Sequence, residues 1–244
     1  MPEPAPLFVS DLHLDPGRPE FFAQFEALLA RYEGRYGALY LLGDLFEFWI
    51  GDDFPNPMAD ATAELLSRLS SRGTPIYFMA GNRDFLLGED YARRCGMTLL
   101  EDPTVIDLNG RPVLLTHGDE LCTDDLPYQQ FRAQVRQPEW ITYFLSRSLE
   151  ERLAMAREAR EASQAHTSGA SGEIMDVNQD AVEALMTRHG VAHMIHGHTH
   201  RPETHHFELN GAPAQRLVLG DWYEQSHIHV ALGLELEAFG GRAA

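Results

Sequence analysis

The stretch Pro6-Leu7-Phe8-Val9-Ser10-Asp11-Leu12-His13 decides how this chain folds. It opens with an apolar run typical of a buried strand and ends with a carboxylate and an imidazole two residues apart. Four later apolar runs also end in short polar motifs, which are Gly43-Asp44, Gly81-Asn82-Arg83-Asp84, His117-Gly118-Asp119 and Gly197-His198-Thr199-His200. This repetition predicts one site built at the ends of five strands.

The predicted strands span residues 6–10, 38–42, 76–80, 113–116 and 192–196. Apolar residues at helical spacing lie between them, most clearly over residues 21–29 and 61–69. Because ligand sites of α/β proteins collect at the carboxyl ends of strands, we expect the polar motifs to meet at one edge. The glycine in each of the four later motifs is expected to allow a sharp turn and leave room for a substrate.

Composition limits the class of protein. The chain has 244 residues, enough for one large core or for a core with an inserted substructure. No apolar run reaches the roughly 20 residues of a membrane-spanning helix, and no signal peptide is expected. Two cysteines are too few for a disulfide framework, which favours a reducing, cytosolic setting. A net charge of −18 argues against general nucleic-acid binding, but not against an anionic substrate held by metal ions.

The motifs together supply ligands for two divalent cations. Asp11 and His13 point to the same side of a strand end, so both can reach one ion. Asp44 has two carboxylate oxygens and can bridge two ions. Oxygen and imidazole ligands without thiolate suit Mn²⁺, Fe²⁺ or Zn²⁺, and two such ions can activate a water for displacement at phosphorus. The candidate ligands are Asp11, His13, Asp44, Asn82, His117, His198 and His200.

Each motif alone has an ordinary explanation. An isolated Asp-x-His is usually a surface turn, and a histidine-rich tract can be fortuitous. The presence of all five motifs, in this order, favours the metal site. His196 is excluded from it, because a histidine inside the predicted strand before Gly197 should be buried in the core.

These motifs resemble the pattern of the calcineurin-like metallophosphoesterase superfamily, D-x-H, GD, GN-[HR]-[DE], H and GH-x-H. The resemblance implies an α/β fold, a four-layer αββα sandwich with an inserted helical lid, and two Mn²⁺ ions per chain. The core would comprise residues 1–123 and 173–244, and the lid residues 124–172. The first ion would be held by Asp11, His13, Asp44 and His200, and the second by Asp44, Asn82, His117 and His198.

Longer motifs make the resemblance more specific. Residues 11–14, 43–53, 81–88, 117–125, 174–179 and 196–202 are similar to the UDP-2,3-diacylglucosamine pyrophosphohydrolases of lipid A biosynthesis. That family resemblance implies hydrolysis of UDP-2,3-diacylglucosamine to UMP and 2,3-diacylglucosamine 1-phosphate. A metal-activated water would attack the α phosphorus. We also expect a cytoplasmic protein, peripheral on the inner membrane, with an acylated nucleotide-sugar substrate, no nucleic-acid partner and no obligate protein partner.

The third motif departs from many members of the superfamily, which carry Gly-Asn-His. A histidine there can protonate an alkoxide leaving group, whereas Arg83 cannot donate a proton at neutral pH. The sequence therefore favours a leaving group that is already a stable anion, such as a sugar phosphate. Arg83 is expected to bind phosphate oxygens and to act in catalysis with Asn82 and His198. The alternative is a surface arginine paired with Asp84.

A segment between the fourth motif and residue 174 interrupts the strand–helix alternation. Residues 128–135 and 139–160 are predicted to be helices, separated at Pro138, and small residues over 163–172 predict a loose stretch. Six arginines and four glutamates between residues 128 and 160 give this segment a positive charge in an acidic chain. It fits a cap over acyl chains that contacts an anionic membrane surface, or else an ordinary helical hairpin on the core.

The resemblance also implies substrate contacts, several of them in the lid. The acyl chamber is expected at Phe131 and Phe144. Two lid positions depart from the family, because its usual asparagine falls on Thr167 and its usual lysine on Ala170, and the chain contains no lysine. The expected substrate-binding residues are Asn82, Arg83, Asp125, Tyr128, Phe131, Phe144, Ser163, Thr167, Ala170 and His198.

Two other functions are compatible with the motifs. A general metallophosphodiesterase for cyclic nucleotides or soluble nucleotide pyrophosphates would not need an apolar helical cap. A metal-dependent binding module that has lost catalysis would usually lack some ligands, and none is missing here.

Overall fold

The computed structural model describes residues 4–169, 176–222 and 228–239. The strands are β1 (Leu7–Val9), β2 (Leu39–Leu42), β3 (Ile76–Met79), β4 (Thr98–Leu100), β5 (Thr104–Asp107), β6 (Pro112–Leu115), β7 (His193–His196), β8 (Glu203–Leu209), β9 (Ala212–Val218), β10 (Ile228–Leu232) and β11 (Glu235–Phe239). The helices are α1 (Pro19–Tyr32), α2 (Pro57–Ser71), α3 (Glu89–Cys95), the short 3₁₀ helix η1 (Asp119–Leu121), α4 (Leu126–Val135), α5 (Pro138–Leu145), α6 (Leu149–Gly169) and α7 (Gln179–His189).

The strands form two mixed sheets, in the orders β11-β10-β1-β2-β3-β4 and β5-β6-β7-β9-β8. β1 to β4 run parallel, as do β6, β7 and β9. The five predicted strands are present as β1, β2, β3, β6 and β7, and each lies inside its sheet with a neighbour on both sides. Interior strands are buried on both faces, which explains their short, continuous apolar runs.

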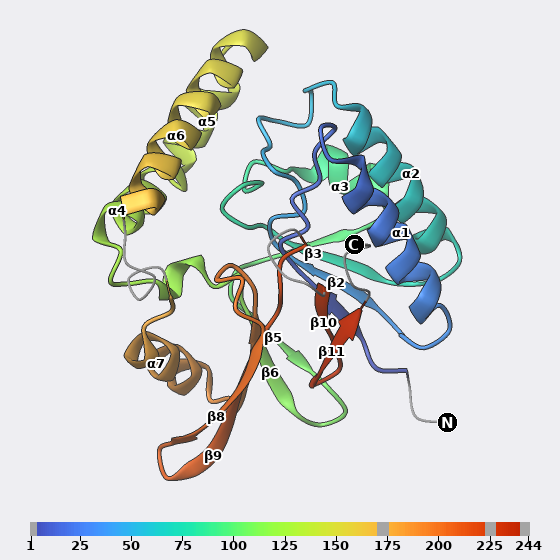
Figure 1. Cartoon of the computed structure of the whole chain (residues 1–244), viewed down its shortest axis with the longest axis vertical. Helices are drawn as coiled ribbons and strands as arrows, with labels where there is room; N and C mark the ends of the chain where they lie inside the picture. The colour runs from blue at the N-terminus through green and yellow to red at the C-terminus, as the bar shows by residue number, and fades with distance from the viewer. Residues whose placement is uncertain (1–3, 170–175, 223–227, 240–244) are drawn as a thin grey trace.

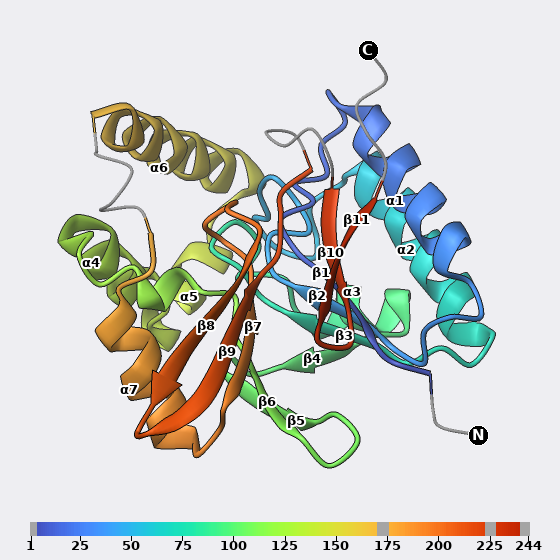
Figure 2. The ribbon, with the colours of Figure 1, turned by 60° about the horizontal axis from the view of Figure 1, so that its bottom comes forward.

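Alternating side chains of these strands enter different cores, and this gives the layers. In β1, Leu7 and Val9 pack with α1, α2 and α3, whereas Phe8 packs between the two sheets. In β6, Val113 faces the same inter-sheet core, while Leu114 packs under α7. The order is therefore helix, sheet, sheet, helix, which confirms the predicted αββα sandwich (Figures 1 and 2).

Local chemistry fixes where the outer helices begin. Helix α2 starts at Asn56, whose side-chain oxygen accepts from the backbone N–H groups of Met58 and Ala59. Pro57 follows at the first helical position, where its missing N–H costs nothing. Met58, Ala59, Thr62, Ala63 and Leu66 then repeat at helical spacing and are buried against the sheet.

The inserted lid contains three helices, α4, α5 and α6, which lie together beside the sheets (Figures 1 and 2). The predicted single helix over 139–160 is wrong, because the chain breaks between α5 and α6. Ser148 causes the restart, since its hydroxyl accepts from Glu151 N–H and the Glu151 carboxylate accepts from Ser148 N–H. The loose stretch predicted from residue 163 is also wrong as far as residue 169, where α6 continues, and its remainder lies outside the described residues.

The lid packs on the loops that follow β2 and β3. Trp140 lies 6.2 Å from the ring of Phe85, and Phe144 stacks on Trp140 at 5.0 Å. Arg152 is buried in α6 and donates to the carbonyl of Ile50 and to the carboxylate of Asp53. In the described part of the chain, no helix is both long and apolar enough to cross a membrane. The division into core 1–123 with 173–244 and lid 124–172 stays a prediction.

Candidate metal centre

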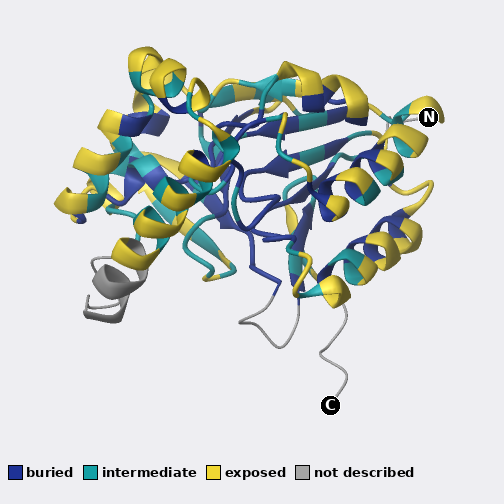
Figure 3. Ribbon diagram, turned by 90° about the horizontal axis from the view of Figure 1, so that it is seen from above, coloured by how far each residue is buried: buried dark blue, intermediate teal, exposed yellow. Residues whose placement is uncertain are grey.

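The seven predicted ligands lie in the loops directly after the five predicted strands. Asp11 and His117 are fully buried, and His13 and Asp44 are 2% exposed. Asn82, His198 and His200 are partly buried. Figure 3 shows that buried residues gather in the interior of the fold, with exposed residues on the outer faces of the helices. His196 is fully buried at the end of β7, as predicted, and its Nε2 faces the guanidinium of Arg216 at 3.0 Å.

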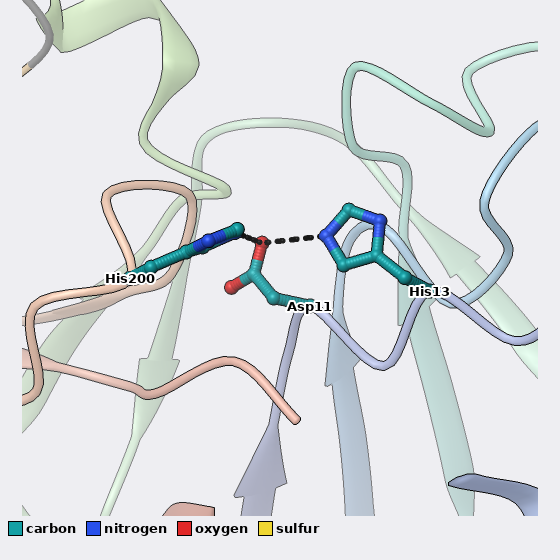
Figure 4. Close-up of side chains that lie close together, drawn as sticks. All are labelled: Asp11, His13 and His200. Atoms are coloured by element: carbon teal, nitrogen blue, oxygen red, sulfur yellow. Dashed lines mark ion pairs between the residues drawn. The ribbon is translucent and has the colours of Figure 1, made fainter. Parts of the chain in front are cut away.

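One group of side chains centres on Asp11. Its Oδ1 lies 3.5 Å from Nε2 of His200 and 4.0 Å from Nε2 of His13 (Figure 4). The two imidazoles approach the carboxylate from opposite sides, one from the loop after β7 and one from the loop after β1. Oδ2 of Asp44 lies 3.7 Å from the same Nε2 of His13. Four predicted ligands therefore meet here.

A second group centres on Asn82. Its side-chain oxygen lies 3.0 Å from Nε2 of His117 and 2.9 Å from Nδ1 of His198. Nε2 of His117 also lies 3.7 Å from Oδ1 of Asp44. The two oxygens of Asp44 thus face different groups, Oδ2 toward His13 and Oδ1 toward His117. This is the arrangement expected of a carboxylate that bridges two ions.

The donor set fits a pair of divalent cations. Ligand atoms of Asp11, His13 and His200 all lie within 4.8 Å of one another, and so do those of Asp11, Asp44 and His117. Several facing oxygen and nitrogen atoms are 3.5–4.0 Å apart, farther than a hydrogen bond allows. Imidazoles and carboxylates that converge in a buried site at such spacings suit divalent ions of the first transition row.

The backbone reaches this arrangement in an unusual conformation. Five of the predicted ligands have positive φ angles, between 48° for His13 and 67° for His198, and the other three are Asp11, Asp44 and His200. Side-chain-bearing residues rarely adopt this left-handed region, and each costs of order 1 kcal/mol or more. Such strain persists where the surroundings hold it in place, and it concentrates at functional sites.

Two motif glycines make room for the ligands themselves. A Cβ atom on Gly81 would lie 2.2 Å from Oδ1 of Asp44, and one on Gly197 would lie 2.4 Å from Oδ2 of Asp11. Any side chain at these positions would displace a carboxylate. The motif glycines were expected to leave room for a substrate. Beside Gly81 and Gly197, side chains of candidate metal ligands occupy that room instead.

A second layer of groups orients the ligands. His117 Nδ1 lies 2.9 Å from the carbonyl oxygen of Leu42, which can only accept, so Nδ1 carries the proton and Nε2 faces the ligand cluster. Asp84 is fully buried and accepts from the backbone N–H groups of Gly81 and Leu45 at 2.8 and 2.7 Å. It joins the loops after β2 and β3 and is not a surface partner of Arg83.

Asp119 links the centre to the lid. It is fully buried, and its carboxylate accepts from the Tyr128 hydroxyl at 2.6 Å and from Nε of Arg132 at 2.8 Å. Burial alone would raise the pKa of Asp119, but the charges of His117 and Arg132 hold it well below its usual range. Helix α4 is thereby fixed beside the ligand loops, and the Tyr128 ring lies 6.1 Å from that of His198.

Metal affinity is expected to rise with pH. Burial alone would lower the pKa of His117, but the carboxylates of Asp44, Asp11 and Asp119 raise it to about 9. Below that pH the metal-free site holds a proton that a cation must displace. The apparent affinity for Mn²⁺ should therefore rise about tenfold per pH unit for each proton displaced. Calorimetric titrations at pH 6, 7 and 8 measure this, and equal affinities would contradict it.

Only some of the predicted substrate-binding residues lie together in the structure. Asn82, Arg83 and His198 lie among the candidate metal ligands, and Tyr128 lies beside them. Nε of Arg83 is buried and has no hydrogen-bond partner within the described ranges. Asp125 caps α4 by accepting from Tyr128 N–H at 3.1 Å.

The remaining predicted substrate contacts belong to the lid. Phe144 is buried in the core formed by the helices and the first sheet, whereas Phe131 is exposed. Ser163 and Thr167 lie in α6, and Ala170 lies outside the described residues.

Comparison with known proteins agrees with this geometry. The family model of calcineurin-like phosphoesterases matches residues 6–202, and the chain belongs to that family. The UDP-2,3-diacylglucosamine hydrolase of Stenotrophomonas maltophilia (strain K279a) is 57% identical over 229 residues, covering 91% of this chain and 92% of that protein. The enzyme of the same name from Aeromonas salmonicida (strain A449) is 53% identical and covers 92% and 88%. Within the phosphoesterases, the chain belongs to the family of these hydrolases.

A solved structure supports the fold at much lower identity. Vacuolar Protein Sorting 29 from Cryptosporidium parvum superposes with a TM-score of 0.51 at 15% identity, covering 98% of this chain and 92% of that one. This likeness concerns the architecture of the two sheets and their helices alone.

Proposed function

We propose that this protein hydrolyses the pyrophosphate bond of UDP-2,3-diacylglucosamine in lipid A biosynthesis, releasing UMP and 2,3-diacylglucosamine 1-phosphate. The observation that carries the proposal is the complete ligand set, gathered from the ends of five strands, in a chain 57% identical to a hydrolase of that name. The oxygen of a water forms the new bond to the α phosphorus, and the bond from that phosphorus to the bridging oxygen breaks. The sugar phosphate leaves as an anion with the bridging oxygen, and a proton of the water passes to solvent.

Two divalent ions belong to the proposed site. Asp11, His13, Asp44 and His200 would hold the first, and Asp44, Asn82, His117 and His198 would hold the second. The oxygen and imidazole ligands suit Mn²⁺, Fe²⁺ or Zn²⁺, and Mn²⁺ is the proposed ion because the family resemblance implies it. When bound, the ions supply positive charge that acidifies a water and offsets charge on the phosphates.

The chain's own residues orient the pyrophosphate. Arg83 offers a buried Nε–H and a planar guanidinium that can bind phosphate oxygens. It stays protonated at all relevant pH values, so it stabilises negative charge rather than donating a proton. Burial and the nearby charge of His117 lower the pKa of His198 to about 4, which keeps its imidazole neutral. A neutral imidazole is the form that binds a metal, and Asn82 offers its amide in the same place.

The lid is the proposed binding region for the acylated sugar. Asp125, Tyr128, Phe131, Phe144, Ser163, Thr167 and Ala170 are its proposed contacts. Leu126, Phe131, Tyr143 and Leu145 are exposed apolar residues of α4 and α5. Together with the lid arginines they suit docking on an anionic lipid surface, so we place the protein on the cytoplasmic face of the inner membrane.

The activity is tested with purified protein, Mn²⁺ and three substrates. UMP should form from UDP-2,3-diacylglucosamine in detergent, but not from UDP-glucose or a cyclic nucleotide, and EDTA should abolish it. Added Mn²⁺ in excess of the chelator should restore the rate. Turnover of only the soluble substrates would favour a general metallophosphodiesterase, and no turnover by a protein with two bound ions would favour a binding module.

A further inference from the structure

Glu47 is a buried carboxylate that the proposed mechanism does not use. It lies in the loop after β2 and is 6% exposed. Its Oε2 lies 3.3 Å from Nδ1 of His13, while Nε2 of the same ring faces Asp11 and Asp44. A histidine that binds a metal through one nitrogen commonly donates its other N–H to a carboxylate, which fixes the ring and raises its basicity.

The other oxygen of Glu47 reaches the lid. Oε1 accepts from the guanidinium of Arg160 in α6 at 2.8 Å. Arg18, which precedes α1, donates to Oε2 at 2.9 Å. Burial alone would raise the pKa of Glu47, but His13, Arg83 and Arg160 lower it to about 2, so it remains a carboxylate. Glu47 therefore contacts both a proposed ligand and the longest helix of the lid.

We propose that Glu47 is a positioning residue that couples the first metal site to the docking of α6. One carboxylate oxygen holds the His13 ring for the ion, and the other holds Arg160. Metal binding at His13 and docking of α6 then stabilise each other. The inference rests on the proposed function through the assignment of His13 as a metal ligand.

The contacts distinguish this coupling from an ordinary surface ion pair. Arg152 already anchors the first turn of α6 through hydrogen bonds to Ile50 and Asp53, neither of which is a proposed metal ligand. Arg160 lies two turns later in the helix, and its partner touches His13. Loss of the Glu47–Arg160 pair should therefore loosen only the later part of the helix. If the two sites are coupled, the same loss should also weaken binding of the metal ion.

The test compares Glu47→Gln, Arg160→Gln and Arg157→Gln with the wild type in the full chain. Arg157 is an exposed arginine of the same helix, so its variant loses the same charge. Mn²⁺ binding is titrated calorimetrically, and hydrogen exchange of the α6 amides is measured with and without Mn²⁺. These readouts do not require substrate.

If Glu47 couples the two sites, the three variants should differ in their affinity for Mn²⁺ and in the hydrogen exchange of α6. Glu47→Gln should weaken Mn²⁺ binding about 10–100-fold. Mn²⁺ should slow exchange in the later turns of α6 in the wild type, but not in Glu47→Gln. Arg160→Gln should weaken Mn²⁺ binding by the same factor by which Mn²⁺ stabilises α6, because coupling is reciprocal. Arg157→Gln should match the wild type.

Other results overturn the inference. Wild-type Mn²⁺ affinity in Glu47→Gln would show that the carboxylate does not position His13. Equal behaviour of Arg160→Gln and Arg157→Gln would remove the coupling to α6, and this comparison stands even if Glu47→Gln does not fold. A wild-type protein that binds no Mn²⁺ would overturn the proposed function as well, which separates the two failures.

Discussion

Asp44→Asn is expected to abolish metal-dependent hydrolysis. The two carboxylate oxygens of Asp44 face His13 and His117 at 3.7 Å each, so this residue joins the two halves of the ligand set. Asparagine presents one oxygen and an NH₂ group that cannot bind a cation. Loss of a bridging anion removes several kcal/mol of stabilisation from the transition state, which corresponds to about a 10³-fold or larger fall in kcat.

Asparagine is chosen because it should keep the loop intact. Asp44 has a φ of 53°, a region that asparagine tolerates far better than alanine. Its oxygen can still accept from Arg83 N–H, as Oδ1 of Asp44 does at 2.8 Å. Mn²⁺ stoichiometry and UMP release are measured together, with Asp60→Asn on the outside of α2 as the matched control. A variant with two bound ions and more than a tenth of the wild-type kcat would contradict the bridging role.

The candidate metal ligands could be predicted to lie together because each follows an interior strand. A strand with neighbours on both sides is buried on both faces, so its sequence is a compact apolar run whose end is easily recognised. β1, β2, β3, β6 and β7 are such strands, and the residues that follow them converge because the parallel strands end at the same edge. The left-handed φ angles of Asp11 and His13 could not be predicted, since they result from the loops being held by many distant contacts.

β8 and β9 were missed for a different reason. β8 is an edge strand and most of its residues are partly or fully exposed, whereas β9 lies between β7 and β8 but begins with exposed residues and has Gln215 and Arg216 at its centre. Neither strand therefore has a continuous apolar run. A local signal was nevertheless present, because Asn210-Gly211 joins them with φ angles of 52° and 80°. Asn-Gly between two alternating stretches is a strong hairpin signal. The same dipeptide, Asn109-Gly110, connects β5 to β6.

The residues that support the candidate ligands were also missed, although one stood within a motif and another close to one. Asp84 ends the third motif, and Glu47 follows the second by three positions. The spacing of ligands shows which residues can reach an ion, but a supporting carboxylate is defined by what it contacts after folding. Glu47 meets Arg160 across 113 positions, and Arg152 meets Asp53 across 99, and such pairs have no local pattern.

Arg83→Ala is expected to lower kcat/KM about 10³-fold, a loss in the range measured for groups that stabilise charge on a transferring phosphoryl. The geometry motivates this size of effect. Arg83 follows Asn82 directly, its backbone N–H donates to Asp44, and its Nε is buried without a partner in the described ranges. A buried N–H of a permanently charged group is costly to leave unpaired, so it should bind an anion.

The conservative variant separates charge from shape. Arg83→Lys keeps the positive charge but loses the planar fork, so it should recover only part of the lost activity. Both variants should bind two Mn²⁺ ions as the wild type does, because the backbone N–H that contacts Asp44 is retained. If kcat/KM is unchanged in Arg83→Ala, the arginine does not touch the substrate. Full rescue by lysine would mean that charge alone, and not two-pronged binding of phosphate oxygens, is what this position supplies.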